Sequence, residues 1–136
     1  MLDVKRNLTT IMDFYELTMA AGYLEEGYEE KISVFDMFFR KIPDGGGYAI
    51  MAGLDTFIEA VENLKFTDQD IEYLAATGVF NEKFLDYLRN FTLHCNIWAI
   101  PEGTPIFPQE PIVTVEGPSI ECQLLETLML VTFNHQ

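Results

Sequence analysis

Residues 119–136 read SIECQLLETLMLVTFNHQ, and this stretch decides what the rest of the chain has to enclose. Ser119 follows a proline and can cap a helix that begins there. Large apolar residues then point in almost every direction around the helix axis: Leu124, Leu125, Leu128, Met129, Leu130, Val131 and Phe133. A helix that is apolar all round has to be buried all round. The stretch therefore predicts a fully buried helix.

The segment before this helix, residues 96–118, reads NIWAIPEGTPIFPQEPIVTVEGP. Short alternating runs at Ile97–Ile100, Pro105–Phe107 and Ile112–Val115 are separated by prolines and glycines. Proline lacks the N–H that a strand ladder needs, so it belongs at edges and in turns. The pattern predicts a meander of short strands.

Residues 32–40, ISVFDMFFR, predict a further strand. Side chains alternate between the two faces of a strand, and large apolar residues fall on both faces here. We therefore expect both faces to be covered. Asp36 and Arg40 share one face but lie about 13 Å apart by strand rise, so each needs its own partner.

The glycine-rich residues 43–47, PDGGG, follow this strand. They predict a turn that leads to a short strand or helix at 48–51, or a backbone that approaches a ligand closely. No helix begins directly after the glycines, which argues against a phosphate cradle.

Four amphipathic helices are predicted, over residues 11–26, 53–64, 67–78 and 81–91. In the first, Thr9 or Thr10 is the expected cap and Gly27 the expected end. In the third, Thr67 and Gly78 play these parts. The expected apolar stripes are Phe14, Leu17, Ala21 and Leu24 in the first helix, and Leu54, Phe57, Ile58 and Val61 in the second.

Together these elements predict an α+β fold in which helices pack on a small, mostly antiparallel sheet. We expect residues 1–117 to form one N-terminal domain and residues 118–136 to form an apolar helix that leads into further structure. Three short helices and a small sheet could hardly enclose that helix. We therefore expect the chain to be the N-terminal piece of a longer protein, with a self-standing chain as the alternative.

The charge of the chain excludes several classes of partner. With 22 Asp and Glu against 8 Lys and Arg, the net charge is −14, which disfavours nucleic acid and anionic membranes as partners. Residues 90–136 contain no Lys or Arg but five glutamates, so a clamp for phosphate groups is expected elsewhere. No P-loop or dinucleotide-binding motif occurs.

Two cysteines, Cys95 and Cys122, are expected to be reduced and to lie in or near the core. His94 next to Cys95 gives too few ligands for zinc, so no metal site is expected. No signal segment and no apolar run of about 18 residues is visible, which favours the cytoplasm.

Residues 12–19, MDFYELTM, combine an acid with two aromatics at the start of the first predicted helix. A core helix needs Phe14, but it does not need Asp13, and Tyr15 lies off the apolar stripe. These two residues are the candidate site residues, although a core or interface tyrosine and a helix-capping aspartate are ordinary alternatives.

Four segments in order resemble the N-terminal part of bacterial nicotinate phosphoribosyltransferases, and together they span nearly the whole chain. They are MDFYELTMAAGY, VFDMFFRKIPDGGGYAIMAGL, PEGTPIFPQEPIVTVEGP and QLLETLMLVTFNHQ. The resemblance implies a type II phosphoribosyltransferase, whose N-terminal α/β domain precedes an irregular α/β barrel.

The resemblance also implies an activity. Enzymes of this family, which are transferases with a ligase-type coupling, join nicotinate to phosphoribosyl pyrophosphate in NAD biosynthesis. ATP hydrolysis through a phosphohistidine drives the reaction, and magnesium accompanies the phosphates. The enzymes are homodimers with shared active sites.

For the candidate residues, the resemblance implies that Tyr15 reaches into the partner subunit's site and stacks on the pyridine ring, with Asp13 beside it. Met12 stands where the family usually has threonine, which removes a hydroxyl cap. His94 and His135 do not match the phosphorylated histidine. No catalytic residue is therefore expected in this chain, which alone should be inactive.

Other functions remain open at this point. The EGTPIFPQEPIVTVEG run resembles biotinyl or lipoyl carrier domains, but no lysine follows Lys83 to carry the group. A non-catalytic dimerisation or binding module and a nicotinamide-specific relative are the alternatives. A quinolinate enzyme fits less well because it lacks the opening run.

Overall fold

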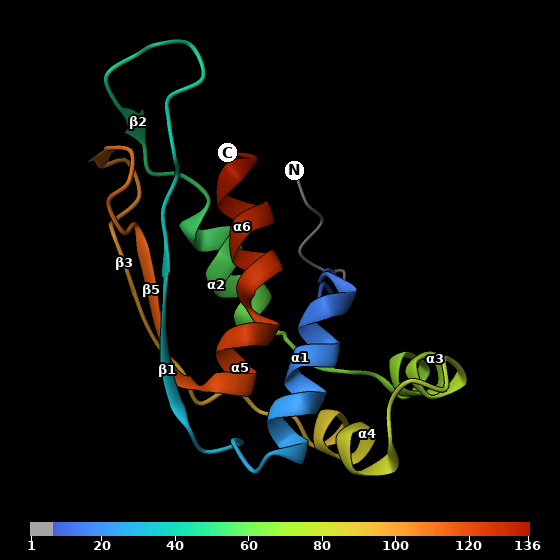
Figure 1. Cartoon of the computed structure of the whole chain (residues 1–136). Helices are drawn as coiled ribbons and strands as arrows, with labels where there is room; N and C mark the ends of the chain where they lie inside the picture. The colour runs from blue at the N-terminus through green and yellow to red at the C-terminus, as the bar shows by residue number, and fades with distance from the viewer. Residues whose placement is uncertain (1–6) are drawn as a thin grey trace.

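The computed structural model of the chain describes residues 7–136, in which six helices and five strands are found (Figure 1). The helices are α1 (Phe14–Glu25), α2 (Leu54–Glu62), α3 (Asp68–Ala76), α4 (Glu82–Arg89), α5 (Ser119–Leu124) and α6 (Glu126–Asn134). The strands are β1 (Ile32–Met37), β2 (Ala49–Ile50), β3 (Asn96–Ala99), β4 (Pro105–Ile106) and β5 (Val113–Pro118).

β5 is the central strand of the main sheet, with β1 and β3 on its two sides, both antiparallel to it. Its inward side chains are buried and alternate with half-buried ones. β2 and β4 form a separate antiparallel pair. The predicted α+β class, with helices on a small antiparallel sheet, is confirmed.

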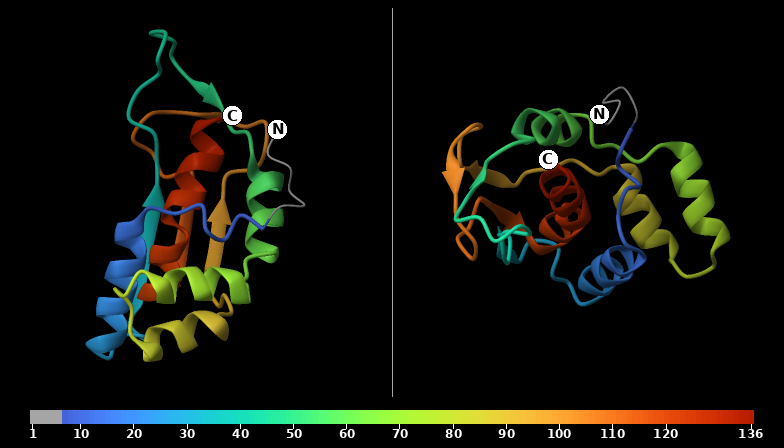
Figure 2. Two further views of the ribbon diagram at one scale, coloured as in Figure 1. Left: turned by 90° about the vertical axis from the view of Figure 1, so that its right-hand side faces the viewer. Right: turned by 90° about the horizontal axis from the view of Figure 1, so that it is seen from above.

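The helices lie in layers on one side of this sheet. Figure 2 shows α6 between the sheet and the other helices, with α1 and α2 flanking it and α3 and α4 farthest from the strands. One apolar cluster lies between the sheet, α2 and α6. A second cluster joins α1, α3, α4 and α5.

The predicted C-terminal helix consists of two helices, because the helical geometry is interrupted at Leu125, between α5 and α6. Ser119 is the first residue of α5 and Pro118 holds the N-cap position, so the predicted serine cap is wrong by one residue. Every residue of α5 is buried between the sheet and α1. The expectation that these elements could hardly enclose the segment is therefore wrong for α5. In α6, Leu130 is exposed.

α1 begins later than predicted, at Phe14, and neither threonine caps it. Asp13 holds the N-cap position, and its side chain makes no capping hydrogen bond. Thr9 instead accepts a hydrogen bond from the Lys65 backbone N–H at 2.8 Å. The predicted end at Gly27 is confirmed: this glycine has φ +74°, a conformation that glycine adopts without strain.

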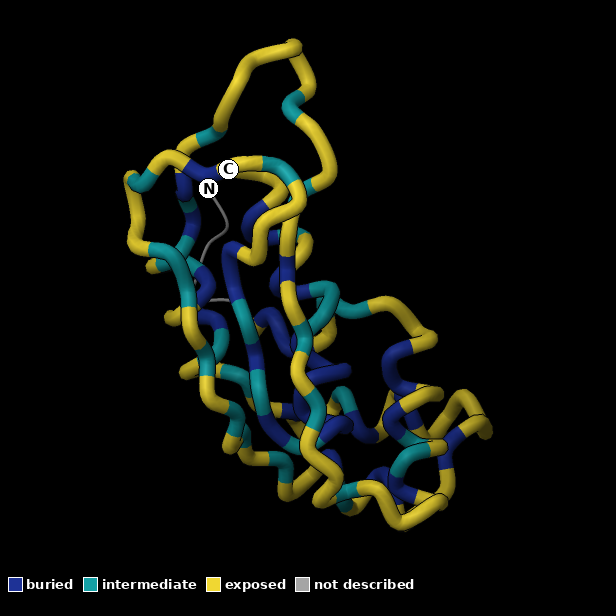
Figure 3. Tube along the Cα trace, turned by 60° about the vertical axis from the view of Figure 1, so that its left-hand side comes forward, coloured by how far each residue is buried: buried dark blue, intermediate teal, exposed yellow. Residues whose placement is uncertain are grey.

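One face of β1 is open, where the sequence predicted that both would be covered. Met37 is buried beneath the helices, but Ile32 and Val34 are exposed on the other face. Trp98 of β3 lies on the same open face of the sheet and is also exposed. Figure 3 shows this alternation along the strands. The helices cover only one face of the three-stranded sheet. The prediction that both faces of β1 are covered is therefore wrong for the described residues.

Further predictions concerned side-chain partners, a helix cap and a helix stripe. Asp36 accepts a hydrogen bond from the Thr114 hydroxyl at 2.5 Å. Arg40 is exposed, so the prediction that it needs a partner within the described chain is wrong. The α3 cap at Thr67 is confirmed. Ile58 is exposed, so its predicted place on the apolar stripe of α2 is wrong. The glycine-rich segment is a protruding connection that leads to β2 (Figure 1). No helix in residues 7–136 combines the length and apolarity needed to cross a bilayer.

Candidate functional site

The aromatic pair at the start of α1 diverges into two environments. The ring of Phe14 packs near Phe80, with a centroid separation of 5.6 Å. The hydroxyl of Tyr15 donates a hydrogen bond to Glu126 Oε1 at 2.8 Å. Both rings are partly exposed, Phe14 at 50% and Tyr15 at 43%, so the predicted place of Phe14 on the buried stripe is wrong. The two differ in their partners, because Tyr15 is bound to the first residue of α6.

Glu126 is held from a second side by a neighbour on α5. Its Oε2 accepts a hydrogen bond from Gln123 Nε2 at 2.6 Å, and Gln123 is almost fully buried. Both oxygens of the carboxylate are thus engaged. A carboxylate is also favoured in the first turn of a helix, because the helix dipole is positive there.

Glu16, next to Tyr15, is completely buried. Its Oε1 accepts hydrogen bonds from the backbone N–H of Thr127, at 2.8 Å, and from the Thr127 hydroxyl. Its Oε2 is buried with no hydrogen-bond partner among the described residues. Burial raises the pKa of this carboxyl to about 7; the nearby Glu126 and Asp13 raise it further, against the Thr127 bonds.

Asp13 lies at the same junction. Its backbone N–H donates to the Thr127 hydroxyl at 3.3 Å, and its side chain is exposed. The structure therefore brings both predicted site residues, Asp13 and Tyr15, to one place, where α1 meets α6. We call the group Asp13, Tyr15, Glu16, Gln123, Glu126 and Thr127 the α1–α6 junction.

The α1–α6 junction is acidic, and this changes the chemistry of the phenol. The hydrogen bond to Glu126 is the main cause that raises the pKa of Tyr15 to about 12, with partial burial and the charges of Glu16 and Asp13 adding to it. A tyrosine phenol is protonated at neutral pH in any case, and the raised pKa keeps it a hydrogen-bond donor to more alkaline pH. Three carboxyl groups so close would repel an anionic group placed among them.

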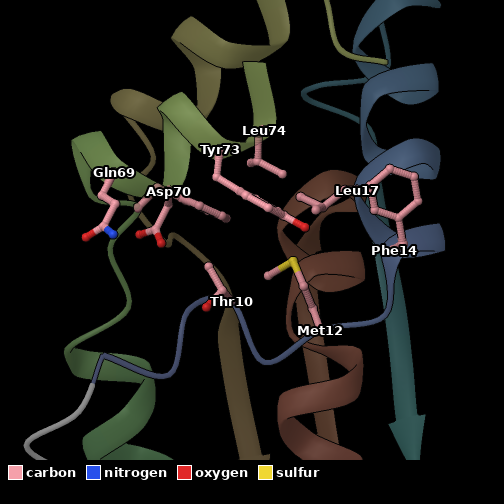
Figure 4. Close-up of a pocket in the computed structure, with 9 residues that line it drawn as sticks. Thr10, Met12, Phe14, Leu17, Gln69, Asp70, Tyr73 and Leu74 are labelled. Carbon is pink, nitrogen blue, oxygen red and sulfur yellow. The ribbon is translucent and has the colours of Figure 1, made fainter. Parts of the chain in front are cut away.

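A cleft of about 520 Å³ lies beside the junction, between α3 and the segment that leads into α1 (Figure 4). Most of its lining is apolar or aromatic, including Met12, Leu17 and Tyr73. Asp70 also lines the cleft, but it is bound to the Thr67 cap. No lysine or arginine lines the cleft, so it suits an apolar group and not a phosphate.

Three of the described basic residues are engaged by other groups of the chain. Lys31 lies over the Tyr28 ring, and Lys83 donates to the Leu24 carbonyl. Arg89 is paired with Glu82 and Asp86 in exposed positions. Arg40, Lys41 and Lys65 are exposed, and Arg40 and Lys41 line one hollow beside Asp36. In residues 7–136 no cluster of three His, Cys, Asp or Glu side chains could hold a metal ion. The described residues thus offer no ligand cluster for magnesium.

The cysteine and histidine residues form a separate group at the end of the sheet. Cys95 and Cys122 are both free, with Sγ atoms 3.8 Å apart, and Cys122 is fully buried. Cys122 lies in the core and Cys95 is half-buried beside it, which confirms the predicted location of the two cysteines. His94 Nδ1 lies 3.0 Å from Glu121 Oε1.

Sequence reasoning missed four of the six junction residues. One signal was available for Glu16, because it lies four and eight residues before Ala20 and Leu24, which are buried. A carboxylate on an apolar stripe is a reason to search for a partner. Nothing local to Glu126 indicates that its partner lies 111 residues earlier in the chain.

The family of the chain follows from comparison with known proteins. Residues 10–134 match the family described as the nicotinate phosphoribosyltransferase N-terminal domain. The chain belongs to the nicotinate phosphoribosyltransferase family. The resemblance carried by the four sequence segments is therefore confirmed.

Relatives of known name agree with this family. A nicotinate phosphoribosyltransferase of Mycobacterium tuberculosis is 44% identical over 118 residues, which cover 87% of this chain and 25% of that protein. The Bacillus subtilis nicotinate phosphoribosyltransferase is 41% identical over 130 residues, or 96% of this chain and 26% of that protein. The chain thus spans about a quarter of the length of these family members.

Solved structures support the fold. Human nicotinic acid phosphoribosyltransferase superposes with a TM-score of 0.82 at 34% identity, over 90% of this chain and 25% of that one. A nicotinate-nucleotide pyrophosphorylase from Pyrococcus furiosus, with a TM-score of 0.60 and 20% identity, shares the fold. The chain therefore has the fold of the N-terminal region of a nicotinate phosphoribosyltransferase.

Proposed function

We propose that this chain is the N-terminal part of an enzyme that makes nicotinate mononucleotide for NAD biosynthesis. The ring nitrogen of nicotinate forms a bond to carbon 1 of phosphoribosyl pyrophosphate, and pyrophosphate leaves with the electron pair of the broken bond. The observation that carries the proposal is the family match over residues 10–134. The protein is placed in the cytoplasm, where free cysteines stay reduced.

In this proposal Tyr15 binds nicotinate in the site of a second subunit of a homodimer. Its ring is partly exposed at the surface, while the hydroxyl is fixed by Glu126. An exposed, oriented ring can stack on a flat pyridine, which contributes about 0.5–1.5 kcal/mol beyond the area buried.

Asp13 is the second residue that we assign to substrate binding. Its exposed carboxylate, next to Tyr15, can orient polar groups near the ring. It would repel the carboxylate of nicotinate, as would Glu126. The substrate carboxylate therefore points away from the α1–α6 junction and is neutralised by residues outside it.

ATP, magnesium and the phosphate groups are bound by parts of the full-length enzyme outside this chain. Two features support this assignment. The chain has no Lys or Arg after Arg89, and Lys83 and Arg89 are bound to other groups of the chain.

The test is mononucleotide formation by the full-length protein and its Tyr15→Ala variant. We expect Tyr15→Ala to raise the KM for nicotinate by about tenfold, equivalent to about 1.4 kcal/mol, because the stacking ring is lost. Tyr15→Phe should cost much less, since it keeps the ring. Steady-state kinetics with nicotinate as the varied substrate measures both effects.

Tyr28→Ala is the matched control, because Tyr28 is 44% exposed, close to the value for Tyr15, but lies beyond the other end of α1. It should leave the KM unchanged. Size-exclusion chromatography with light scattering should show that Tyr15→Ala remains a dimer. An equal loss for Ala and Phe would assign the effect to the hydroxyl and contradict stacking.

A nicotinamide-specific enzyme is the second candidate, and the acidic α1–α6 junction is the observation that favours it. A neutral amide next to Asp13 and Glu126 avoids the repulsion that a carboxylate meets there. Assays with nicotinamide in place of nicotinate separate the two candidates. Faster turnover of nicotinamide would overturn the first proposal.

A non-catalytic dimerisation or binding module is the third candidate. The open face of the sheet favours it, because Ile32, Val34 and Trp98 are exposed there. Formation of nicotinate mononucleotide by the full-length protein would exclude it.

A further inference from the structure

The phenol of Tyr15 is fixed although its ring is exposed. An exposed tyrosine normally samples several rotamers, and ordering it on binding costs free energy. Here the hydroxyl donates to Glu126 Oε1 at 2.8 Å, across 111 residues of sequence. The ring is thus anchored at its hydroxyl end, and the residue remains 43% exposed.

The acceptor is fixed as well. Glu126 Oε2 accepts from Gln123 Nε2 at 2.6 Å, and Gln123 is nearly inaccessible to solvent, so the carboxylate has little freedom to turn. A mobile acceptor would move with the phenol. A fixed acceptor defines one orientation of the ring.

The backbones that carry the two side chains are tied to each other. Glu16 Oε1 accepts from the Thr127 backbone N–H at 2.8 Å. The Thr127 hydroxyl in turn accepts from the Asp13 backbone N–H at 3.3 Å. These bonds lie next to Tyr15 on α1 and next to Glu126 on α6. The spacing between phenol and carboxylate is therefore set by the junction.

We propose that Glu126 is a positioning residue for nicotinate binding: it holds the Tyr15 ring in the orientation that stacks on the pyridine. This inference rests on the proposed function of Tyr15 and deepens it. A side chain oriented before binding loses less entropy when the substrate arrives, which favours affinity. Glu126 does not touch the substrate and acts only through Tyr15.

The test uses the full-length enzyme and four variants: Glu126→Ala, Glu126→Gln, Tyr15→Phe, and Glu126→Ala with Tyr15→Phe. Glu126→Ala and Tyr15→Phe remove the same hydrogen bond, so each should raise the KM for nicotinate by a similar factor, about twofold to threefold, the low end of the range for one lost hydrogen bond and well below the effect of Tyr15→Ala. The KM for phosphoribosyl pyrophosphate should stay within about twofold, since that substrate does not contact Tyr15. Glu126→Gln keeps an acceptor oxygen and should restore most of the affinity.

The double variant carries the sharpest prediction. If Glu126 acts only through the phenol, its removal has no further effect once the hydroxyl is gone, so the double variant should match Tyr15→Phe. Glu116→Ala is the matched control: Glu116 is also half-buried but lies on β5, opposite Val34 and Asn96. It should leave the KM for nicotinate unchanged.

Three results would overturn the inference while leaving the proposed function intact. They are an unchanged KM for nicotinate in Glu126→Ala, a multiplicative effect in the double variant, and a parallel rise in both KM values, which a general structural role predicts. An enzyme without nicotinate turnover, or one in which Tyr15→Ala has no effect, would overturn the proposed function first and this inference with it.

Discussion

Glu16 is an acidic residue in a buried position, and it stabilises the start of another helix. A buried carboxylate is costly, and one of its oxygens has no partner among the described residues. The other oxygen accepts two hydrogen bonds from Thr127, one of them from a backbone N–H in the first turn of α6. That N–H has no partner within its own helix, so Glu16 acts as a cap supplied from α1.

Glu16 should make the stability of the protein depend on pH. Its folded pKa of about 7 lies above the ordinary value of 4.5. Its favourable contribution is therefore fully present below pH 4.5 and is lost as the pH rises through 7, by up to about 3 kcal/mol. Glu16→Gln carries no titrating group, so its thermal midpoint relative to wild type should rise between pH 5.5 and pH 8.

The control for this pH effect is Glu72→Gln on α3, where the glutamate is exposed. Its midpoint relative to wild type should not change over the same interval. A Glu16→Gln variant that follows wild type in parallel at both pH values would show that Glu16 titrates normally. It would contradict burial as the cause of the raised pKa.

At the scale of elements, three helices illustrate caps that come from increasing distances along the chain. The α3 cap is local: the Thr67 hydroxyl accepts from the Asp70 N–H, and the Asp70 carboxylate accepts from the Thr67 N–H. α2 begins after Gly53, which has no side chain, so Glu102 accepts from the backbone N–H groups at its start, at 3.0 and 2.9 Å. The cap of α6 comes from Glu16, 111 residues away.

The local cap of α3 gives a prediction at this scale. Thr67→Ala removes the hydroxyl of the capping box and should lower the free energy of unfolding by about 1 kcal/mol. Thr67→Ser keeps the hydroxyl and should remain close to wild type. Thermal unfolding midpoints of the two variants provide the check, and a serine variant as unstable as the alanine variant would show that the threonine methyl group is what matters.

At the scale of the whole molecule, the two apolar clusters stabilise different groups of helices and strands. One stabilises the contact of the sheet with α2 and α6, and the other the contact of α1 with α3, α4 and α5. α5 contributes residues to the second cluster and α6 to the first, so these two consecutive helices connect the clusters. The α1–α6 junction lies where the two groups of elements meet, which explains how residues remote in sequence come to share it.

The isolated chain, residues 1–136, should form no nicotinate mononucleotide above background. The physical reason is the shortage of cations to bind phosphate groups: the chain from Asn90 onward contains no Lys or Arg, and Lys83 and Arg89 are already bound to other groups of the chain. The assay compares the isolated chain with the full-length protein at equal molar concentration. Turnover by the isolated chain would place phosphate binding within it and contradict our assignment.

The sequence by itself determined the local features of this protein. The α+β class, the cap at Thr67 and the end of α1 at Gly27 follow from periodicity and from backbone preferences of neighbouring residues. The strand predicted over residues 32–40 is found as well, although it ends at Met37. Four sequence segments in order also indicated the family, and the match over residues 10–134 confirmed it. Tyr15 and Asp13 stood out because neither suits an apolar stripe.

Only the tertiary structure decided what these two residues contact. Hydrogen bonds such as Tyr15–Glu126 and Glu16–Thr127 join helices at opposite ends of the chain, and no local pattern encodes their pairing. The open face of β1 was mistaken for a covered one for the same reason, because alternation tells which residues share a face but not what packs on it. Local preferences act over a few residues, whereas packing brings together residues that are separated by the whole length of the chain.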